Sequence, residues 1–136
     1  MSAAPRQLRL SPDKARLTVV WADREDSLEA EYLRVCSPSA DIRGHGGEWQ
    51  IVGGKRGVRI QNIQPVGRYA VRLVFSDGHD TGLYTWAGMR EFADREQEWW
   101  PRYLQRMEGY GMSRDPEVNV MPLNALNALK KAPGKP

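Results

Sequence analysis

Apolar and polar residues alternate through the middle of the chain, a pattern typical of half-buried antiparallel strands. Residues 58–63 and 68–75 have this period of two, and a short segment containing proline and glycine joins them. The Asp77-Gly78 pair then favours a hairpin turn, because glycine adopts a positive φ without steric cost. Residues 83–86 are typical of a returning strand.

The first third of the chain contains shorter apolar clusters at residues 8–10, 17–21 and 28–33. Turn-forming segments separate them, so we expect two or three short strands, with helix around Glu29 to Leu33. Residues 36–47 are dense in Ser, Pro, Gly and Asp and predict an irregular loop.

Beyond Trp86 the apolar residues recur at steps of three and four, which indicates an amphipathic helix. Pro101 interrupts this pattern and predicts either a kink or a second helix that starts with Pro101 in its first turn. The expected fold class is therefore α+β: a small, mainly antiparallel β-sheet unit packed by a C-terminal amphipathic helix, kinked or split near Pro101.

Length and composition predict a single domain over residues 6–110, followed by a flexible tail over 111–136 that is rich in Pro, Asn, Ala and Lys. The chain has no apolar run long enough to span a membrane and no signal-peptide pattern at its start. Cys36 is its single cysteine, so no internal disulfide forms. These features predict a cytoplasmic protein without a membrane partner.

The net charge of +3 comes mainly from arginine. Arg59 and Arg72 occupy strand positions that should face solvent, and Lys55, Arg56 and Arg68 extend this face. Such a surface is most simply a solvated outer face of a sheet. We expect no nucleic-acid partner; weak binding of phosphates by this arginine-rich face is an alternative.

Residues with catalytic potential are few. Of the two histidines, His45 and His79, neither forms the His-x-Asp pair common in non-haem iron oxygenases. Cys36 would need a basic partner to act as a nucleophile. Glycines surround His45, but the lysine and hydroxyl residue that end a nucleotide-binding P-loop are absent. The residues predict a protein that is not an enzyme.

His79 is the residue best placed to bind a ligand, since the predicted turn presents it between Asp77 and Asp80. One interpretation is a weak iron or zinc site at His79, with Asp77, Asp80, Cys36 or His45 as further ligands. The other is a structural turn, in which His79 hydrogen-bonds to the serine-rich loop.

Three blocks in order resemble the gamma-butyrobetaine hydroxylase-like N-terminal domain family: residues 33–46, residues 65–71 and residues 75–86, the last reading FSDGHDTGLYTW. The resemblance covers roughly residues 8–107. It implies a small α+β unit that occurs alone in bacteria, at the front of carnitine-pathway oxygenases, and fused to P-loop iron–sulfur carriers of the Mrp type.

In the oxygenases the resemblance implies a structural zinc site, made by a Cys-Pro-Cys-x-x-Cys run and the histidine that matches His79. The three cysteine positions are Ser37, Ser39 and Ile42 here, and Cys36 lies one residue early. Serine hydroxyls are poor zinc ligands beside thiolates, so we expect no closed zinc site. We expect no catalytic oxygenase domain to accompany this module.

The resemblance therefore implies a non-catalytic accessory or interaction module with a protein partner. The fusions suggest a link to iron–sulfur cluster assembly through a P-loop iron–sulfur carrier. A metal-binding module using His79 is the main alternative.

Overall fold

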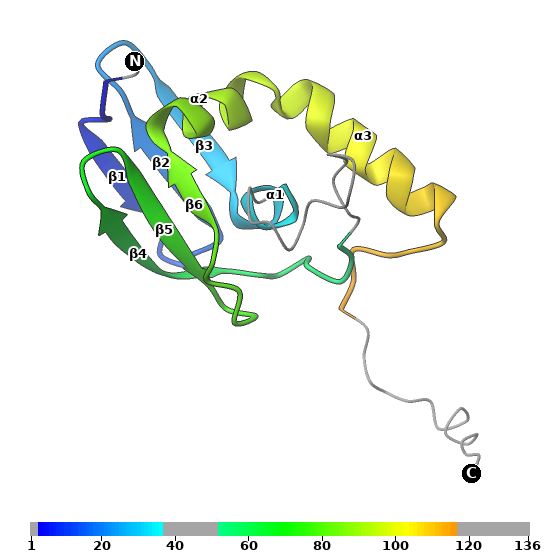
Figure 1. The fold of residues 1–136 in the computed structure, drawn as a ribbon. Coiled ribbons are helices and arrows are strands. Elements are labelled where there is room, and N and C mark those ends of the chain that lie inside the picture. The colour runs from blue at the N-terminus through cyan, green and yellow to red at the C-terminus, as the bar shows by residue number, and fades with distance from the viewer. Residues whose placement is uncertain (1–2, 37–51, 117–136) are drawn as a thin grey trace.

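The computed structural model describes residues 3–36 and 52–116 of the 136-residue chain (Figure 1). It contains two antiparallel three-stranded sheets, with strand orders β1-β2-β3 and β4-β5-β6. The strands are β1 Gln7–Leu10, β2 Arg16–Val20, β3 Glu25–Glu29, β4 Ile60–Val66, β5 Ala70–Phe75 and β6 Leu83–Thr85. The helices are α1 Ala30–Val35, α2 Trp86–Asp94 and α3 Glu96–Gly109. The expected α+β fold class is confirmed.

One apolar core joins the two sheets. Leu17 and Val19 on β2 are fully buried, as are Leu73 and Phe75 on β5, and all four belong to one hydrophobic cluster. They alternate with more exposed neighbours along each strand, because successive side chains point to opposite faces. The apolar face of each sheet therefore faces the shared core.

Two strand boundaries in the second sheet differ from expectation. β4 runs on through Pro65 to Val66, so the turn to β5 falls at residues 67–69, where Gly67 has a φ of 58°. Proline is tolerated here because β4 is the edge strand of its sheet. The predicted returning strand also ends earlier, since Trp86 is the first residue of α2.

The C-terminal helical region is split, and the break lies at Arg95. Of the two alternatives predicted for Pro101, the second helix with Pro101 in its first turn was wrong, since α3 begins at Glu96 and contains Pro101 in its interior. Thr85 explains the start of α2, because its hydroxyl accepts a hydrogen bond from the Gly88 N–H at 3.0 Å.

The two helices have different neighbours. α2 lies against β3 and β6 and buries Met89 and Phe92 (Figure 1). In α3 the Trp99 ring meets Phe92 of α2 edge-on at 5.6 Å between centroids, and the Trp100 ring meets Tyr32 of α1 at 6.2 Å. The aromatic residues of α3 thus pack against helices, while α2 is the helix beside the sheets.

None of the three helices in the described parts of the chain combines the length and apolar character needed to cross a membrane.

The segment after α3 lies beside the segment that leads into β4. The N–H of Gly54 donates to the carbonyl of Ser113 at 2.9 Å, and the N–H of Arg56 donates to the carbonyl of Arg114 at 2.8 Å. These two hydrogen bonds join the segment after α3 to the segment before β4.

Candidate functional site

The loop between β5 and β6 contains the predicted Asp-Gly turn. Gly78 has a φ of 92° and donates its N–H to the carbonyl of Phe75 at 3.0 Å. The carbonyl of His79 accepts from the Phe75 N–H at 2.9 Å, and the Asp77 Oδ1 accepts from the His79 N–H at 3.1 Å. The Asp77 side chain thus fixes the turn, and the turn chemistry is as the sequence predicted.

Asp77 also fastens this turn to the rest of the molecule. Its Oδ2 accepts from the Nε of Arg34 on α1 at 2.9 Å and lies 2.6 Å from the Nζ of Lys55. The side chains of Arg34, Lys55 and Asp77 are only 9%, 21% and 19% exposed. We call these three residues the Asp77 clasp.

The clasp keeps Asp77 ionised. Burial alone raises the pKa of a carboxyl group, but the hydrogen bonds from Lys55 and the His79 N–H and the charge of Arg34 outweigh it and lower the pKa to about 2. A carboxylate that is already paired with two cations is a weak ligand for a metal ion.

A second, partly buried ion pair involves α1, the helix that carries Arg34. Arg114 donates from Nε and Nη2 to the two carboxylate oxygens of Glu31 at 2.8 and 2.7 Å, and its guanidinium lies 5.2 Å from the centre of the Trp100 ring. The phenol of Tyr103 is held neutral nearby, since burial and the charge of Glu31 raise its pKa. Glu31 and Arg34, three residues apart on α1, therefore tie this helix to two distant segments.

The other predicted ligands are dispersed or unsuited to metal binding. Cys36 is buried, and burial raises the pKa of its thiol to about 12, so the reactive thiolate is disfavoured. The ring of His79 is partly buried with its centre 6.1 Å from that of Phe75, and Asp80 is exposed. His45, Ser37, Ser39 and Ile42 lie outside the described residues. Within residues 3–36 and 52–116, no three His, Cys, Asp or Glu side chains come together in a metal-binding group.

The arginine-rich face is smaller than the sequence suggested. Arg59, Arg68 and Arg72 are exposed, as expected for a solvated face. Lys55 and Arg56 do not extend it freely, because Lys55 binds Asp77 and Arg56 pairs with Asp115.

Sequence reasoning missed the basic half of the clasp. Arg34 stands between Leu33 and Val35 in an apolar stretch, and a charged residue within an apolar helical stretch signals a buried, paired charge. Lys55 gives no such signal, because it lies in a polar, glycine-containing segment far from Asp77 in sequence.

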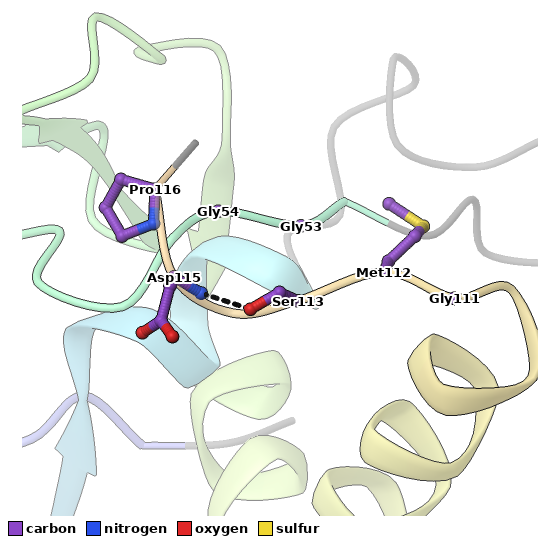
Figure 2. A pocket seen from close by; sticks show the side chains of 7 residues that line it. All are labelled: Gly53, Gly54, Gly111, Met112, Ser113, Asp115 and Pro116. Carbon is purple, nitrogen blue, oxygen red and sulfur yellow. Dashed lines mark hydrogen bonds between the residues drawn. The ribbon is translucent and has the colours of Figure 1, made fainter. Parts of the chain in front are cut away.

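A hollow of about 550 Å³ lies where the two side-by-side segments meet the end of α3 (Figure 2). It is lined by Gly53, Gly54, Gly111, Met112, Ser113, Asp115 and Pro116. A Cβ atom on Gly53 would stand 2.9 Å from the Ser113 carbonyl oxygen, so only glycine permits this close approach.

Exposed large apolar side chains fall close together in sequence around the end of α3. Four such residues are exposed in the described parts of the chain, and three of them, Leu104, Tyr110 and Met112, lie in the second half of α3 and just after it. Tyr110 is the most exposed, at 66%. We call these three residues the α3-end surface; Met112 belongs both to it and to the hollow.

Solved structures similar to this chain share its fold. Two solution structures determined by NMR are each 39% identical to it with a TM-score of 0.73. One covers 88% of this chain and 96% of its own, and the other covers 86% and 89%. A crystal structure of a protein with unknown function from Acidithiobacillus ferrooxidans, of the DUF971 family, is 40% identical over 65% of this chain and 91% of its own, with a TM-score of 0.56.

No curated protein matches the chain. The family described as gamma-butyrobetaine hydroxylase-like, N-terminal, matches residues 8–90, which include the whole Asp77 clasp and both sheets. The match spans more than half of the chain and agrees with the three sequence blocks around the hairpin. The chain therefore belongs to the gamma-butyrobetaine hydroxylase-like, N-terminal family.

Proposed function

We propose that this protein is a non-catalytic interaction module whose partner is a P-loop iron–sulfur carrier, and that it binds this partner through the α3-end surface. The observation behind the proposal is that three of the four exposed large apolar side chains of the described chain, Leu104, Tyr110 and Met112, fall within nine consecutive residues in the second half of α3 and just after it. Exposed large apolar side chains that gather in one place are typical of interaction surfaces, and tyrosine and methionine are enriched there.

The reactive groups near the family's signature hairpin support a non-catalytic role. Asp77 is occupied by two cations, and the Cys36 thiol is buried with its pKa raised to about 12. A nucleophile or general base needs an accessible group with a suitable pKa, and neither residue provides one.

The choice of partner comes from the family resemblance, in which domains of this kind occur fused to Mrp-type carriers. A domain that is fused to a carrier in one protein and separate in another is expected to contact that carrier in both. The hollow beside the α3-end surface offers backbone groups of Gly53 and Ser113 around an apolar Met112 side chain, a mixture suited to a protein segment.

Isothermal titration calorimetry tests the proposal with the full chain and a purified P-loop iron–sulfur carrier from the same organism, in its apo and cluster-loaded forms. We expect saturable binding that falls at least about tenfold in the double variant Tyr110→Ser, Met112→Ser, since truncating central interface residues costs more than 1 kcal/mol each. Tyr69→Ser is the matched control, because Tyr69 is the one exposed large apolar residue in the described chain away from this surface.

Absence of binding to both forms of the carrier would overturn the choice of partner. An equal loss of affinity in Tyr69→Ser would overturn the choice of surface.

The metal-binding alternative at His79 has less support. Of its expected co-ligands, Asp77 is held by Arg34 and Lys55, and Cys36 is buried as a thiol. It remains testable by metal analysis of the reloaded protein.

A further inference from the structure

The Arg34 guanidinium has donors that nothing in the described chain uses. Its side chain is 9% exposed, and its Nε donates to Asp77. Within residues 3–36 and 52–116, its Nη1 is buried and has no hydrogen-bond partner, the one such side-chain atom found there. Buried polar groups are almost always hydrogen-bonded, and a buried charged donor without an acceptor is unfavourable. The unused Nη1 therefore marks a place where an acceptor is missing.

The charges around Arg34 identify the kind of acceptor. Arg34 and Lys55 share one carboxylate, that of Asp77, and both approach the same oxygen, Oδ2. The neighbouring Glu31 and Arg114 neutralise each other. These two ion-pair groups contain three cations and two carboxylates in the described part of the chain. One positive charge, shared by Arg34 and Lys55, is therefore left in excess. A water molecule satisfies a hydrogen bond but no charge, whereas an oxyanion satisfies both.

The cluster is reachable from solvent on its Lys55 side. The Lys55 side chain is 21% exposed and that of Asp77 is 19% exposed, whereas Arg34 is the innermost of the three. Lys55 has three ammonium donors, and its contact with Asp77 uses one of them, so it can bind a further oxygen without leaving Asp77.

We propose that Arg34 and Lys55 form a binding site for a small oxyanion, a carboxylate or phosphate group, beside Asp77. Arg34 Nη1 donates to the oxyanion from inside, and the Lys55 ammonium binds it from the solvent side. Asp77 orients both cations through Oδ2, and its Oδ1 is held by the His79 N–H. This site is separate from the α3-end surface, so either proposal can fail without the other.

NMR of ¹⁵N-labelled full-length protein tests the site through the Arg34 Nε–H resonance, which the 2.9 Å bond to Asp77 should protect from exchange. We titrate sodium phosphate and, separately, sodium acetate against sodium chloride at equal ionic strength. We expect a saturable shift of this resonance with phosphate, acetate or both, and a parallel rise in the melting temperature, because a ligand that binds only the folded state stabilises it. The anion that acts at lower concentration distinguishes a phosphate ligand from a carboxylate ligand.

Two variants locate the effect. Lys55→Gln should weaken anion binding at least about tenfold, as expected for loss of a charge-assisted contact. Arg102→Gln removes an exposed arginine of α3 and should leave binding unchanged. Substituting Arg34 itself threatens folding, because its side chain is only 9% exposed. Lys55 is more exposed, at 21%, so the Lys55→Gln protein is expected to fold and to report on anion binding.

The proposal is overturned if phosphate and acetate act no differently from chloride up to about 50 mM, a concentration far above that needed for a millimolar site. It is equally overturned if Lys55→Gln binds the anion as the wild type does, or if a crystal grown with phosphate shows only an ordered water on Arg34 Nη1.

Discussion

Replacing Asp77 with Asn tests how far the clasp stabilises the fold. The pKa of Asp77 falls from 3.8 to about 2 in the folded protein, and a difference of this size corresponds to roughly 2–3 kcal/mol of folding free energy. Asn is nearly isosteric, so the variant removes the charge and keeps the turn. It also leaves the mostly buried Arg34 without its counter-charge, a change that costs about 3–5 kcal/mol in buried pairs. We expect a loss of about 2–4 kcal/mol near pH 7.

The pH dependence of the unfolding free energy distinguishes the contribution of the Asp77 charge from that of its packing. Since the folded-state pKa of Asp77 lies below the unfolded value, its stabilisation is complete above pH 3.8 and is lost as the pH falls from there through about 2. Urea unfolding followed by tryptophan fluorescence should therefore show a large difference between wild type and Asp77→Asn near pH 7 that shrinks toward about pH 2.

Asp80→Asn provides the control, because exposed Asp80 lies three residues away in the same loop. We expect it to change stability by no more than about 0.5 kcal/mol. A loss below about 0.5 kcal/mol in Asp77→Asn, or a loss that stays constant with pH, would refute the reasoning.

Three further predictions concern other parts of the molecule. The Cys36 thiol should resist alkylation near pH 8 in the folded protein and react fully in urea, because burial raises its pKa to about 12; equal rates in both states, measured by mass spectrometry, would contradict this. Gly53→Ala should lower stability by about 1–3 kcal/mol in thermal unfolding and expose the Gly54 amide to hydrogen exchange, since the new Cβ meets the Ser113 carbonyl; Gly109→Ala, with no neighbour within 4 Å, should be neutral or stabilising. His79→Ala should leave the metal content of chelator-treated and reloaded protein unchanged by elemental analysis, and loss of a stoichiometric metal would instead establish the metal-binding alternative.

The sequence predicted those elements whose apolar pattern matches their burial. β5 alternates between buried and more exposed residues from Val71 to Phe75 as expected, and the Asp77-Gly78 turn has the positive φ that its glycine allows. At these positions the conformation that the local sequence favours is also the one that tertiary packing requires, so the sequence predicted it correctly.

Positions where tertiary context prevails were harder to predict. Pro65 suggested a turn, but it is accommodated in β4 because β4 is the edge strand of its sheet in the described part of the chain. Pro101 suggested a helix boundary, whereas the break falls at Arg95, where the chain turns from α2 to α3.

In the candidate site too, the local turn was predicted from the sequence and the tertiary contacts were not. The pattern around His79 located the correct hairpin, but the contacts that define the site belong to Asp77. Its partners Arg34 and Lys55 lie 43 and 22 residues earlier in the sequence. Pairings over such sequence separations depend on how the two sheets and α1 pack together. The exposure of Leu104 was likewise hidden, because it lies in the same apolar helical pattern as the buried Tyr103 and Met107.

The most direct test of the central claim is to map the carrier's contact surface by NMR. Amide and methyl resonances of the full-length protein are compared with and without the unlabelled P-loop iron–sulfur carrier. The account predicts that the perturbed resonances concentrate at Leu104, Tyr110, Met112 and the neighbouring Gly53, with the Asp77 clasp unaffected. Perturbation centred on Arg59 and Arg72 of the sheet face, or none at saturating carrier, would contradict it.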